Sequence, residues 1–527
     1  MSTSADEMRR SVRNVAIMSI LEEVAAAVPD RVAIAWPVGD RIAEITYAEL
    51  QEDAWGLARR LRGLVAPGER VAVWAANCAD WLILEYAAAA ASVTLVPLNT
   101  ALTDEEALHQ LEASQARVLF CAWTLRGAPL FTRASALALQ LSHPCVVVDL
   151  EGWPALPESQ LEIVAPDPHR PFLIQYTSGT TGRPKGAVLT QYAAFNAAAL
   201  SSARLEPGAS EIWCSAMPMH HVGGSVSVAL SILAMAGTIV LMPSFDAGET
   251  IRLAARTRAT IIGGVPTMMT DVLDHPSLVD HDLSSVRVVL VGGSNVAPSL
   301  IGRIETTLGA RVVNAYGQSE APNTAQTSLG ADDLDKAETI GTANPGHEVK
   351  VIDIRTGSPA PVGGSGELCI RSPFMMSGYH DDPMQTSEAI DSDGWLHTGD
   401  LVSVDERAIL RFTGRLRDVI ISGGENIYPA EVEAILTQHP QVADVAVVAG
   451  PDDRWGEVPV AFVRLAPGAQ GDLDAIEAFG RASLAAFKVP KRWIAVTEFP
   501  LTASGKVQRY VLRDRLARHA AAGAGMP

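Results

Sequence analysis

A run of hydroxyl and glycine residues that ends in a lysine is the segment of this sequence best suited to bind phosphate. It covers residues 176–186, Tyr-Thr-Ser-Gly-Thr-Thr-Gly-Arg-Pro-Lys-Gly, directly after the apolar run 172–175. Glycines let successive backbone N–H groups converge on an anion, while the hydroxyls add donors and the lysine adds charge. The spacing is not that of a Walker loop, and a plain Ser/Thr/Gly hairpin is the alternative. The candidate phosphate ligands are Thr177, Ser178, Gly179, Thr180, Thr181, Gly182 and Lys185.

The segment Asn314-Ala-Tyr-Gly-Gln-Ser-Glu320 combines an aromatic ring and a carboxylate directly after an expected strand at 311–313. Tyr316 can stack on an adenine ring, and Glu320 can hold a hard divalent cation such as magnesium through its oxygens. An ordinary strand-to-loop corner without a ligand is the alternative.

Asp400 closes the motif Gly394-Trp-Leu-His-Thr-Gly-Asp400, and Arg415 follows in Phe412-Thr-Gly-Arg415. A carboxylate is a natural acceptor for paired ribose hydroxyls, and an arginine can donate to the same sugar. Such a pair is able to bind a sugar, and a tight turn with a surface ion pair is the alternative.

Lys506 stands near the C-terminus in Leu501-Thr-Ala-Ser-Gly-Lys506. A mobile lysine between a carboxylate and an α-phosphate would neutralise the charge that builds in the transition state. A lysine at such a place is otherwise usually a solvated charge.

Two adjacent histidines, His220 and His221, raise the question of a metal site. Neighbours in sequence point apart and no third ligand is close, so the pattern favours a core or gating role.

The elements that must position these motifs alternate between apolar strand-like runs and amphipathic helical runs. This rhythm is typical of a parallel sheet covered by helices. From about residue 341 the sequence pattern becomes typical of strands and turns, and a second α/β unit follows residue 414. The expected strands include 71–75, 93–97, 117–121, 260–264 and 286–291, and the expected helices include 80–91, 104–113, 268–273, 298–308, 430–438 and 473–483.

Composition describes a large globular protein. The chain has 527 residues, of which 48% are hydrophobic and 19% charged, which predicts two or three domains. The net charge of −19 disfavours nucleic-acid or anionic-membrane binding as a general role. Five scattered cysteines without a Cys-x-x-Cys pair indicate neither a disulfide framework nor a zinc site. With no secretory signal, and with 222–245 interpreted as a buried helix and a strand rather than a membrane span, a cytoplasmic protein is expected.

Together, the motifs resemble those of the acyl-adenylate-forming superfamily, which includes acyl-CoA synthetases, aryl-CoA ligases, beetle luciferases and the adenylation domains of peptide synthetases. The resemblance extends over about 46–509. It implies an α/β fold in which a large N-terminal domain of βαβ-type layered sheets with a β-rich subdomain precedes a small mobile α/β domain. The implied boundaries are 1–414 for the ATP and acyl domain, 415–418 for the hinge and 419–527 for the mobile domain.

The resemblance also assigns roles to individual residues. Besides the loop, the ATP and AMP site would comprise Gly292, Gly293, Ser294, Asn314, Ala315, Tyr316, Gly317, Gln318, Ser319, Asp400, Arg415 and Lys506. A roomy hydrophobic acyl pocket would be lined by His221, Val222, Gly223, Gly264, Val265, Ala315 and Gly317. Coenzyme A would contact Gly423, Gly424, Trp455 and Lys488, and Arg417 would be the hinge residue. Mg2+ would be held by Glu320 and Thr177, and the catalytic residues would be Lys506, Glu320 and His221.

Three positions depart from the family pattern. Ser319 replaces the more usual threonine, Arg417 stands where members usually carry lysine or aspartate, and Val489 where some relatives have arginine.

The implied function is an ATP-dependent carboxylate:CoA ligase that forms an acyl-adenylate of a bulky hydrophobic acid and transfers the acyl group to coenzyme A. Two alternatives stay open: an enzyme that only thiolates a supplied acyl-adenylate, and a non-enzymatic adenylate-binding regulator. A luciferase-like oxygenase shares the adenylation residues, whereas a peptide-synthetase module is disfavoured because Phe-Asp-x-Ser is not found near His221. The expected partners are the acid or its adenylate, ATP, Mg2+ and coenzyme A, with no nucleic acid, no membrane span and a homodimer left open.

Overall fold

The computed structural model describes residues 12–521 apart from 164, 178–183, 294–295, 297, 423–424, 453, 467–468, 470–472 and 502–506. The chain divides into two compact units. The first comprises Met1–Val349 and Ile370–Leu396, and the second comprises Lys350–Cys369 and His397–Pro527. Each unit is described by itself below.

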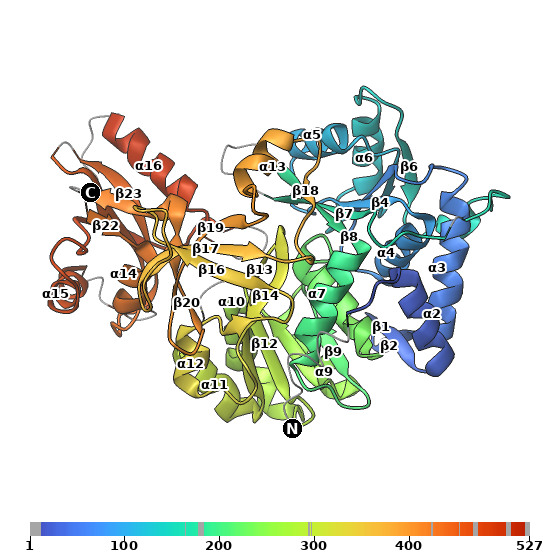
Figure 1. Ribbon diagram of the computed structural model, residues 1–527. Coiled ribbons are helices and arrows are strands. Elements are labelled where there is room, and N and C mark those ends of the chain that lie inside the picture. Colours follow the sequence, from blue (N-terminus) through green and yellow to red (C-terminus); the bar gives the residue numbers. More distant parts are fainter. Residues whose placement is uncertain are drawn as a thin grey trace. The chain divides into compact units, whose positions relative to one another are not determined.

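The first sheet of the first unit has the strand order β15-β14-β13-β12-β11-β9-β10-β1-β2 (Figure 1). The strands from β13 to β1 run parallel, and antiparallel strands complete both edges. Most of the parallel strands are short Val/Ile/Leu-rich runs, as expected when helices cover both faces. The strands are β1 (Val32–Val38), β2 (Arg41–Thr46), β9 (Ile212–Ser215), β10 (Thr238–Leu241), β11 (Ile261–Gly264), β12 (Val288–Gly292), β13 (Arg311–Gln318), β14 (Ala321–Gln326) and β15 (Thr342–Ala343).

The second sheet has the order β18-β8-β7-β4-β3-β5-β6. Strands β7, β4, β3, β5 and β6 are parallel, whereas β8 returns antiparallel to β7 and pairs with β18. The strands are β3 (Arg70–Trp74), β4 (Thr94–Pro97), β5 (Val118–Cys121), β6 (Val146–Asp149), β7 (Pro171–Thr177), β8 (Lys185–Thr190) and β18 (Gly378–Tyr379).

Helices connect and cover these strands, and two of them begin at capping boxes. Thr46 caps α3 with Glu49, and Thr103 caps α5 with Glu106, so each pair satisfies backbone N–H groups that the first turn leaves open. The helices are α2 (Ile17–Ala27), α3 (Tyr47–Leu61), α4 (Ala79–Ala91), α5 (Asp104–Ser114), α6 (Leu130–Ala138), α7 (Gln191–Ala203), α8 (Ser231–Ala234), α9 (Ala247–Thr257), α10 (Pro266–Asp274), α11 (Pro298–Leu308), α12 (Asp333–Glu338) and α13 (Pro383–Ala389).

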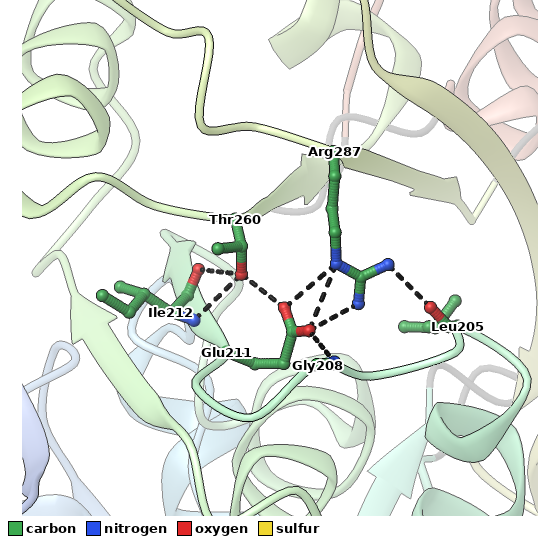
Figure 2. A network of polar contacts seen from close by, with 6 residues as sticks. All are labelled: Leu205, Gly208, Glu211, Ile212, Thr260 and Arg287. Atoms are coloured by element: carbon green, nitrogen blue, oxygen red, sulfur yellow. Dashed lines mark hydrogen bonds and ion pairs between the residues drawn. The ribbon is translucent and has the colours of Figure 1, made fainter.

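A buried polar network holds the edge at which β9, β11 and β12 begin (Figure 2). The Glu211 carboxylate accepts hydrogen bonds from Arg287 at 2.7 Å and from the Thr260 hydroxyl at 2.5 Å. Arg287 also donates to the carbonyl of Leu205 at 2.8 Å, and Gly208 donates its N–H to Glu211. Since Thr260 and Arg287 each stand just before a strand, the network ties the strand beginnings together.

The second unit contains one four-stranded sheet, in which β19 and β20 are antiparallel, and one mixed sheet. The first of these has the order β16-β17-β19-β20, and the other has β22-β21-β24-β23 with β25 paired to β24. Val445, Val447, Ala461, Val463 and Ile476 belong to the core between the mixed sheet and its helices. The elements are β16 (Glu348–Ile352), β17 (Ser365–Arg371), β19 (Leu396–Val404), β20 (Leu410–Arg415), β21 (Ile420–Ser422), β22 (Glu425–Ile427), α14 (Pro429–Leu436), β23 (Val442–Asp452), β24 (Gly456–Leu465), α15 (Leu473–Ser483), β25 (Arg492–Val496) and α16 (Arg509–Ala521).

The α/β class, the βαβ rhythm and most expected elements are confirmed, but one expected strand is longer in the structure. The strand expected at 311–313 continues to Gln318, because β14 turns back and pairs with it, so the Tyr316 motif lies within a hairpin. The apolar segment 222–245 is a π-helical turn (Gly223–Leu230), α8 and β10, as the buried interpretation predicted in outline. Among the described residues, no helix is both long and apolar enough to cross a membrane.

Candidate active site

The predicted site residues of the first sheet follow the carboxyl ends of neighbouring parallel strands. His221, Val222 and Gly223 follow β9, and Val265 follows β11. Register pairs Gly264 with Val291 and Gly292 with Ala315, which places the ends of β11 and β12 next to Ala315 within β13. Ligands of open α/β sheets bind at such an edge. The structure therefore brings the predicted acyl and adenine segments together, while Ser294 lies outside the described residues.

Several glycines at this edge are required by close backbone packing. A Cβ on Gly292 would lie 2.8 Å from the carbonyl oxygen of Ala315, and one on Gly317 would lie 2.6 Å from the backbone nitrogen of Asn323. Neither neighbour is a flexible side chain that could move aside. Part of the glycine pattern that suggested a ligand pocket is thus also a condition for forming the strand ends.

The turn that carries His221 is held by hydrogen bonds from two directions. Asn77 donates to the carbonyls of Met217 and Met242 at 3.0 Å each and accepts the N–H of Met219 at 2.8 Å. The Nδ1 atom of His221 accepts the N–H of Gly223 at 3.0 Å. That bond fixes the tautomer and leaves Nε2 as the ring nitrogen that carries a proton when the ring is neutral.

His220 has a different environment from its neighbour. Burial lowers the pKa of His220 to about 4, so this ring is neutral near pH 7. Its backbone carbonyl accepts a hydrogen bond from Gln175 of β7 at 2.8 Å. The turn after β9 is therefore joined to the strand that leads into the phosphate loop.

Two methionines at the predicted acyl pocket were missed by sequence reasoning. The Met217 Cε lies 2.8 Å from where a Cβ on Gly223 would be, and the Met268 Sδ lies 2.7 Å from the corresponding point on Gly264. Methionine is flexible and fills irregular apolar space. The glycines therefore leave space that adaptable side chains occupy, and only the spacing in the fold could reveal this.

The predicted phosphate loop connects β7 to β8. Thr177 and Lys185 face each other in register at the open end of this hairpin, and the Thr177 hydroxyl donates to the Lys185 carbonyl at 3.4 Å. Ser178, Gly179, Thr180, Thr181 and Gly182 lie outside the described residues. The structure thus places both ends of the loop at the end of β7, next to the turn after β9.

Tyr379 connects the phosphate hairpin to the predicted cation ligand, and the sequence did not single it out. Its hydroxyl donates to Glu320 Oε1 at 2.9 Å, and the Lys185 Nζ lies 5.2 Å from the centroid of its ring. Burial raises the pKa of Tyr379 above its usual range, and the Glu320 charge raises it further. Tyr379 is therefore a neutral donor at physiological pH.

The other residues of the predicted adenine motif differ in how deeply they are buried and in whether they bond within the protein. Tyr316 is half-buried on β13 opposite Ala325, as a stacking ring at the sheet edge would be. The Asn314 amide instead donates to the Thr339 carbonyl at 2.7 Å within the protein. Ser319 is buried, and Gln318 is half-buried.

In the second unit, Asp400 and Arg415 face each other across β19 and β20. Arg415 Nε lies 3.1 Å from Asp400 Oδ1. Asp400 is buried and Arg415 is half-buried, so water reaches the arginine side of the ion pair. The guanidinium has several N–H donors and can therefore also donate to a ligand. The two residues proposed to bind one ribose are therefore brought together.

A neighbouring carboxylate supports the turn before Asp400. Glu367 accepts the N–H of Gly399 at 3.0 Å through one oxygen and contacts His397 Nδ1 at 2.9 Å through the other. Glu367, Cys369 and His397 also have donor atoms close enough to hold a metal ion. The two hydrogen bonds of Glu367 explain why these residues lie together: they support the Thr398-Gly399-Asp400 turn.

Of the four predicted coenzyme A residues, the structure describes Trp455 and Lys488. Gly423 and Gly424 lie outside the described residues, but β21, which leads into them, pairs with β24 through Ser422 and Gly456. The half-exposed Trp455 lies directly before Gly456. Lys488 forms an ion pair with Glu431 at 2.5 Å, so its charge already has a partner.

The predicted hinge residue Arg417 and the predicted catalytic Lys506 are the last two of the predicted site residues. Burial, together with the nearby Arg415, lowers the pKa of Arg417. Lys506 lies outside the described residues. The chain after it is anchored by Arg509, whose guanidinium meets Glu433 at 2.5 and 2.9 Å.

Fold and site together describe an α/β adenylate-forming enzyme with a small C-terminal unit. The family described as AMP-binding enzyme matches residues 21–380, and its C-terminal domain matches residues 431–506. The chain belongs to the AMP-binding enzyme family.

Relatives and solved structures agree with this assignment. A medium-chain acyl-CoA ligase, ACSF2 of Danio rerio, is 33% identical and covers 92% of this chain and 86% of its own. A 3-(7a-methyl-1,5-dioxo-octahydro-1H-inden-4-yl)propanoyl:CoA ligase of Mycobacterium tuberculosis is 34% identical and covers 94% of this chain and 98% of its own. ATP-bound MatB from Rhodopseudomonas palustris superposes with a TM-score of 0.86 at 27% identity, covering 94% of this chain and 98% of that one.

Proposed function

We propose that this protein is an ATP-dependent ligase that joins a bulky hydrophobic carboxylic acid to coenzyme A through an acyl-adenylate. The observation that carries the proposal is the match along almost the whole chain to acyl-CoA ligases, which spans 98% of one such enzyme. The residue types near the strand ends support the proposal, because they include a hairpin rich in hydroxyls and glycines, a tyrosine, a carboxylate and a histidine beside apolar residues.

In the first step, a carboxylate oxygen of the acid attacks the α-phosphorus of ATP, and pyrophosphate leaves with the electron pair of the broken P–O bond. The loop from Thr177 to Lys185 binds the departing phosphates, and Lys506 approaches the α-phosphate to balance its charge. Asp400 and Arg415 hold the ribose, while Tyr316 stacks on the adenine. These groups act mainly by positioning and by charge stabilisation.

Magnesium fits the donor atoms present. Glu320 and Thr177 offer oxygen, the ligand type that this hard cation prefers, and the Tyr379 hydroxyl donates a hydrogen bond to Glu320 Oε1. Bound there, the cation would offset charge on the phosphate oxygens.

In the second step, the thiol of coenzyme A attacks the acyl carbonyl, the thiol proton is lost to solvent or base, and AMP leaves. We assign 415–418 as a hinge about which the C-terminal part turns, so that Lys506 withdraws and the Gly423-Gly424 hairpin enters. Trp455 directly precedes Gly456, which pairs with Ser422 of β21, and we assign Trp455 to the nucleotide end of coenzyme A. In this arrangement the ion pair between Lys488 and Glu431 must break before Lys488 can bind a coenzyme A phosphate.

The acid is proposed to be apolar and bulky. Val222 and Val265 are buried, and the methionines Met217 and Met268 stand beside Gly223 and Gly264. Relatives named for medium-chain and bicyclic acids support this choice. We place the enzyme in the cytoplasm, consistent with five free cysteines.

The test is pyrophosphate release with Mg·ATP and a panel of fatty, aryl and polycyclic acids, with and without coenzyme A. Mass spectrometry would follow acyl-AMP and acyl-CoA. Acid-dependent pyrophosphate with coenzyme A-dependent thioester is the expected result. Thioester from synthetic acyl-adenylates alone, without pyrophosphate from any acid, would restrict the protein to the second half-reaction, and neither product would contradict enzymatic function.

A further inference from the structure

Tyr379 touches two oppositely charged residues of the proposed phosphate site from different sides of one side chain. Its hydroxyl donates to Glu320 and its ring face receives the Lys185 ammonium, at 2.9 Å and 5.2 Å respectively. We propose that Tyr379 is a positioning residue that orients the Glu320 carboxylate toward the cation accompanying ATP and keeps the Lys185 ammonium apart from it. This inference rests on the proposed function of the site.

The phenol is held in place by backbone contacts, so its position does not depend on the side chain alone. β18 pairs with β8 through Gly378 and Val188, and His380 donates its N–H to the Gly186 carbonyl at 2.8 Å. On the other side, Met376 donates its N–H to the Glu320 carbonyl at 2.7 Å. The segment 376–380 therefore joins the strand after the phosphate loop to the turn that carries Glu320.

Such a connection separates two charges that would otherwise attract each other. A direct Lys185–Glu320 ion pair would neutralise the phosphate-binding cation and the metal-binding anion together. The phenol donates a hydrogen bond to one oxygen of the carboxylate and so fixes its orientation, whereas the ring offers the ammonium a weak cation–π contact. Because that contact is weak, an arriving phosphate can take the ammonium from the ring.

The hydroxyl and the ring should therefore have separable effects. Tyr379→Phe removes only the hydrogen bond to Glu320 and keeps the ring against Lys185. Tyr379→Leu removes both contacts while keeping an apolar side chain. Tyr192→Phe is the matched control, because Tyr192 lies on α7 of the same unit and has no role in the proposed site.

The experiment measures Mn2+ binding to the full chain by electron paramagnetic resonance, in the presence of an ATP analogue with a methylene bridge between the α- and β-phosphorus atoms. Binding of the same analogue without metal is measured in parallel by calorimetry. We expect Tyr379→Phe to weaken Mn2+ binding about tenfold, the usual effect of one hydrogen bond to a charged group, and to leave metal-free analogue binding unchanged. Tyr379→Leu should weaken both, and Tyr192→Phe neither.

Unchanged Mn2+ binding in Tyr379→Phe would overturn the proposal, as would an equal loss of metal and metal-free analogue binding in that variant. Thermal unfolding of each variant shows whether the fold is intact. The readout needs no turnover, so it separates this inference from the ligase assignment. Absence of acyl-CoA synthesis by the wild-type protein would reject the ligase assignment and leave the metal measurement informative.

Discussion

The two ends of the first sheet use the same strands for different purposes. Where β9, β11 and β12 begin, the buried Glu211 carboxylate is saturated by Arg287, Thr260 and Gly208. At the other edge, β11 and β12 end in glycines, and the half-buried Tyr316 and Glu320 lie in β13 and in the turn after it. Polar groups that satisfy one another stabilise the fold, and polar groups left partly accessible can bind a ligand. The comparison separates the polar groups that hold the strand beginnings together from the predicted site at the carboxyl ends of the strands.

The largest expected effect is a loss of activity when Glu320, near the carboxyl ends of the strands, is substituted. Glu320→Gln should lower kcat for acid-dependent pyrophosphate release by about 100-fold or more, since it removes a charge that supports transition-state stabilisation. The melting temperature should stay close to that of the wild type. Glu348→Gln, at an exposed carboxylate paired with Arg371, is the control. A large loss of stability in Glu320→Gln would mean that the two ends are not separated.

Where the strands begin, we expect a substitution to lower stability and to leave activity unchanged. Glu211→Gln should lower the free energy of unfolding by about 3 kcal/mol, because it breaks a buried charge pair whose arginine is partly solvated. The kcat of the folded protein at low temperature should not change. Denaturant unfolding and steady-state kinetics on the same samples would measure both quantities.

The Glu211 effect should depend on pH in a defined direction. Burial works to raise the pKa of Glu211, but hydrogen bonds from Arg287 and Thr260 outweigh it and leave the pKa below its usual value. Its stabilisation is therefore present above the unfolded pKa of about 4.3 and is lost as the pH falls through the folded value. The stability difference between wild type and Glu211→Gln should shrink on acidification, and a growing difference would contradict the ion pair.

Two adjacent glycines sharpen the comparison at the turn after β9. A Cβ on Gly224 would lie 2.3 Å from the Pro218 carbonyl oxygen, whereas one on Gly223 would meet the mobile end of Met217 at 2.8 Å. Gly224→Ala should therefore destabilise the protein by about 2 kcal/mol and raise the KM for the acid, whereas Gly223→Ala should mainly shift preference toward smaller acids. Equal effects of the two substitutions on stability would show that the turn adapts freely.

The smallest effect is expected at the adenine ring. Tyr316→Leu should raise the KM for ATP about fivefold, in line with about 1 kcal/mol for an aromatic stacking contact, and leave the KM for the acid unchanged. Tyr316→Phe should behave like the wild type. A loss in Tyr316→Phe equal to that in Tyr316→Leu would point to the hydroxyl instead of the ring.

The sequence predicted the parts of this site that are continuous motifs. Asp400 and Arg415 were read from the sequence as a pair and face each other across β19 and β20. The strands were predictable because fully buried parallel strands are short apolar runs with helices between them.

Residues that act through long-range packing were not predictable. Tyr379 lies 59 residues from Glu320, and Asn77 lies 140 residues from Met217. A single tyrosine or asparagine gives no signal of its partner, because the contact depends on how two sheets meet. The extension of β13 to Gln318 was missed for a similar reason, since it depends on pairing with β14.

The most direct test of the central claim is to follow heavy oxygen from a doubly labelled carboxylic acid through one round of acyl-CoA synthesis. Attack of the carboxylate on the α-phosphorus carries one labelled oxygen into AMP when the thiol displaces it. We predict AMP with one labelled oxygen, unlabelled pyrophosphate and acyl-CoA that retains the other label. Label in inorganic phosphate with ADP as co-product, or acyl-CoA formed with unlabelled AMP, would contradict the acyl-adenylate route.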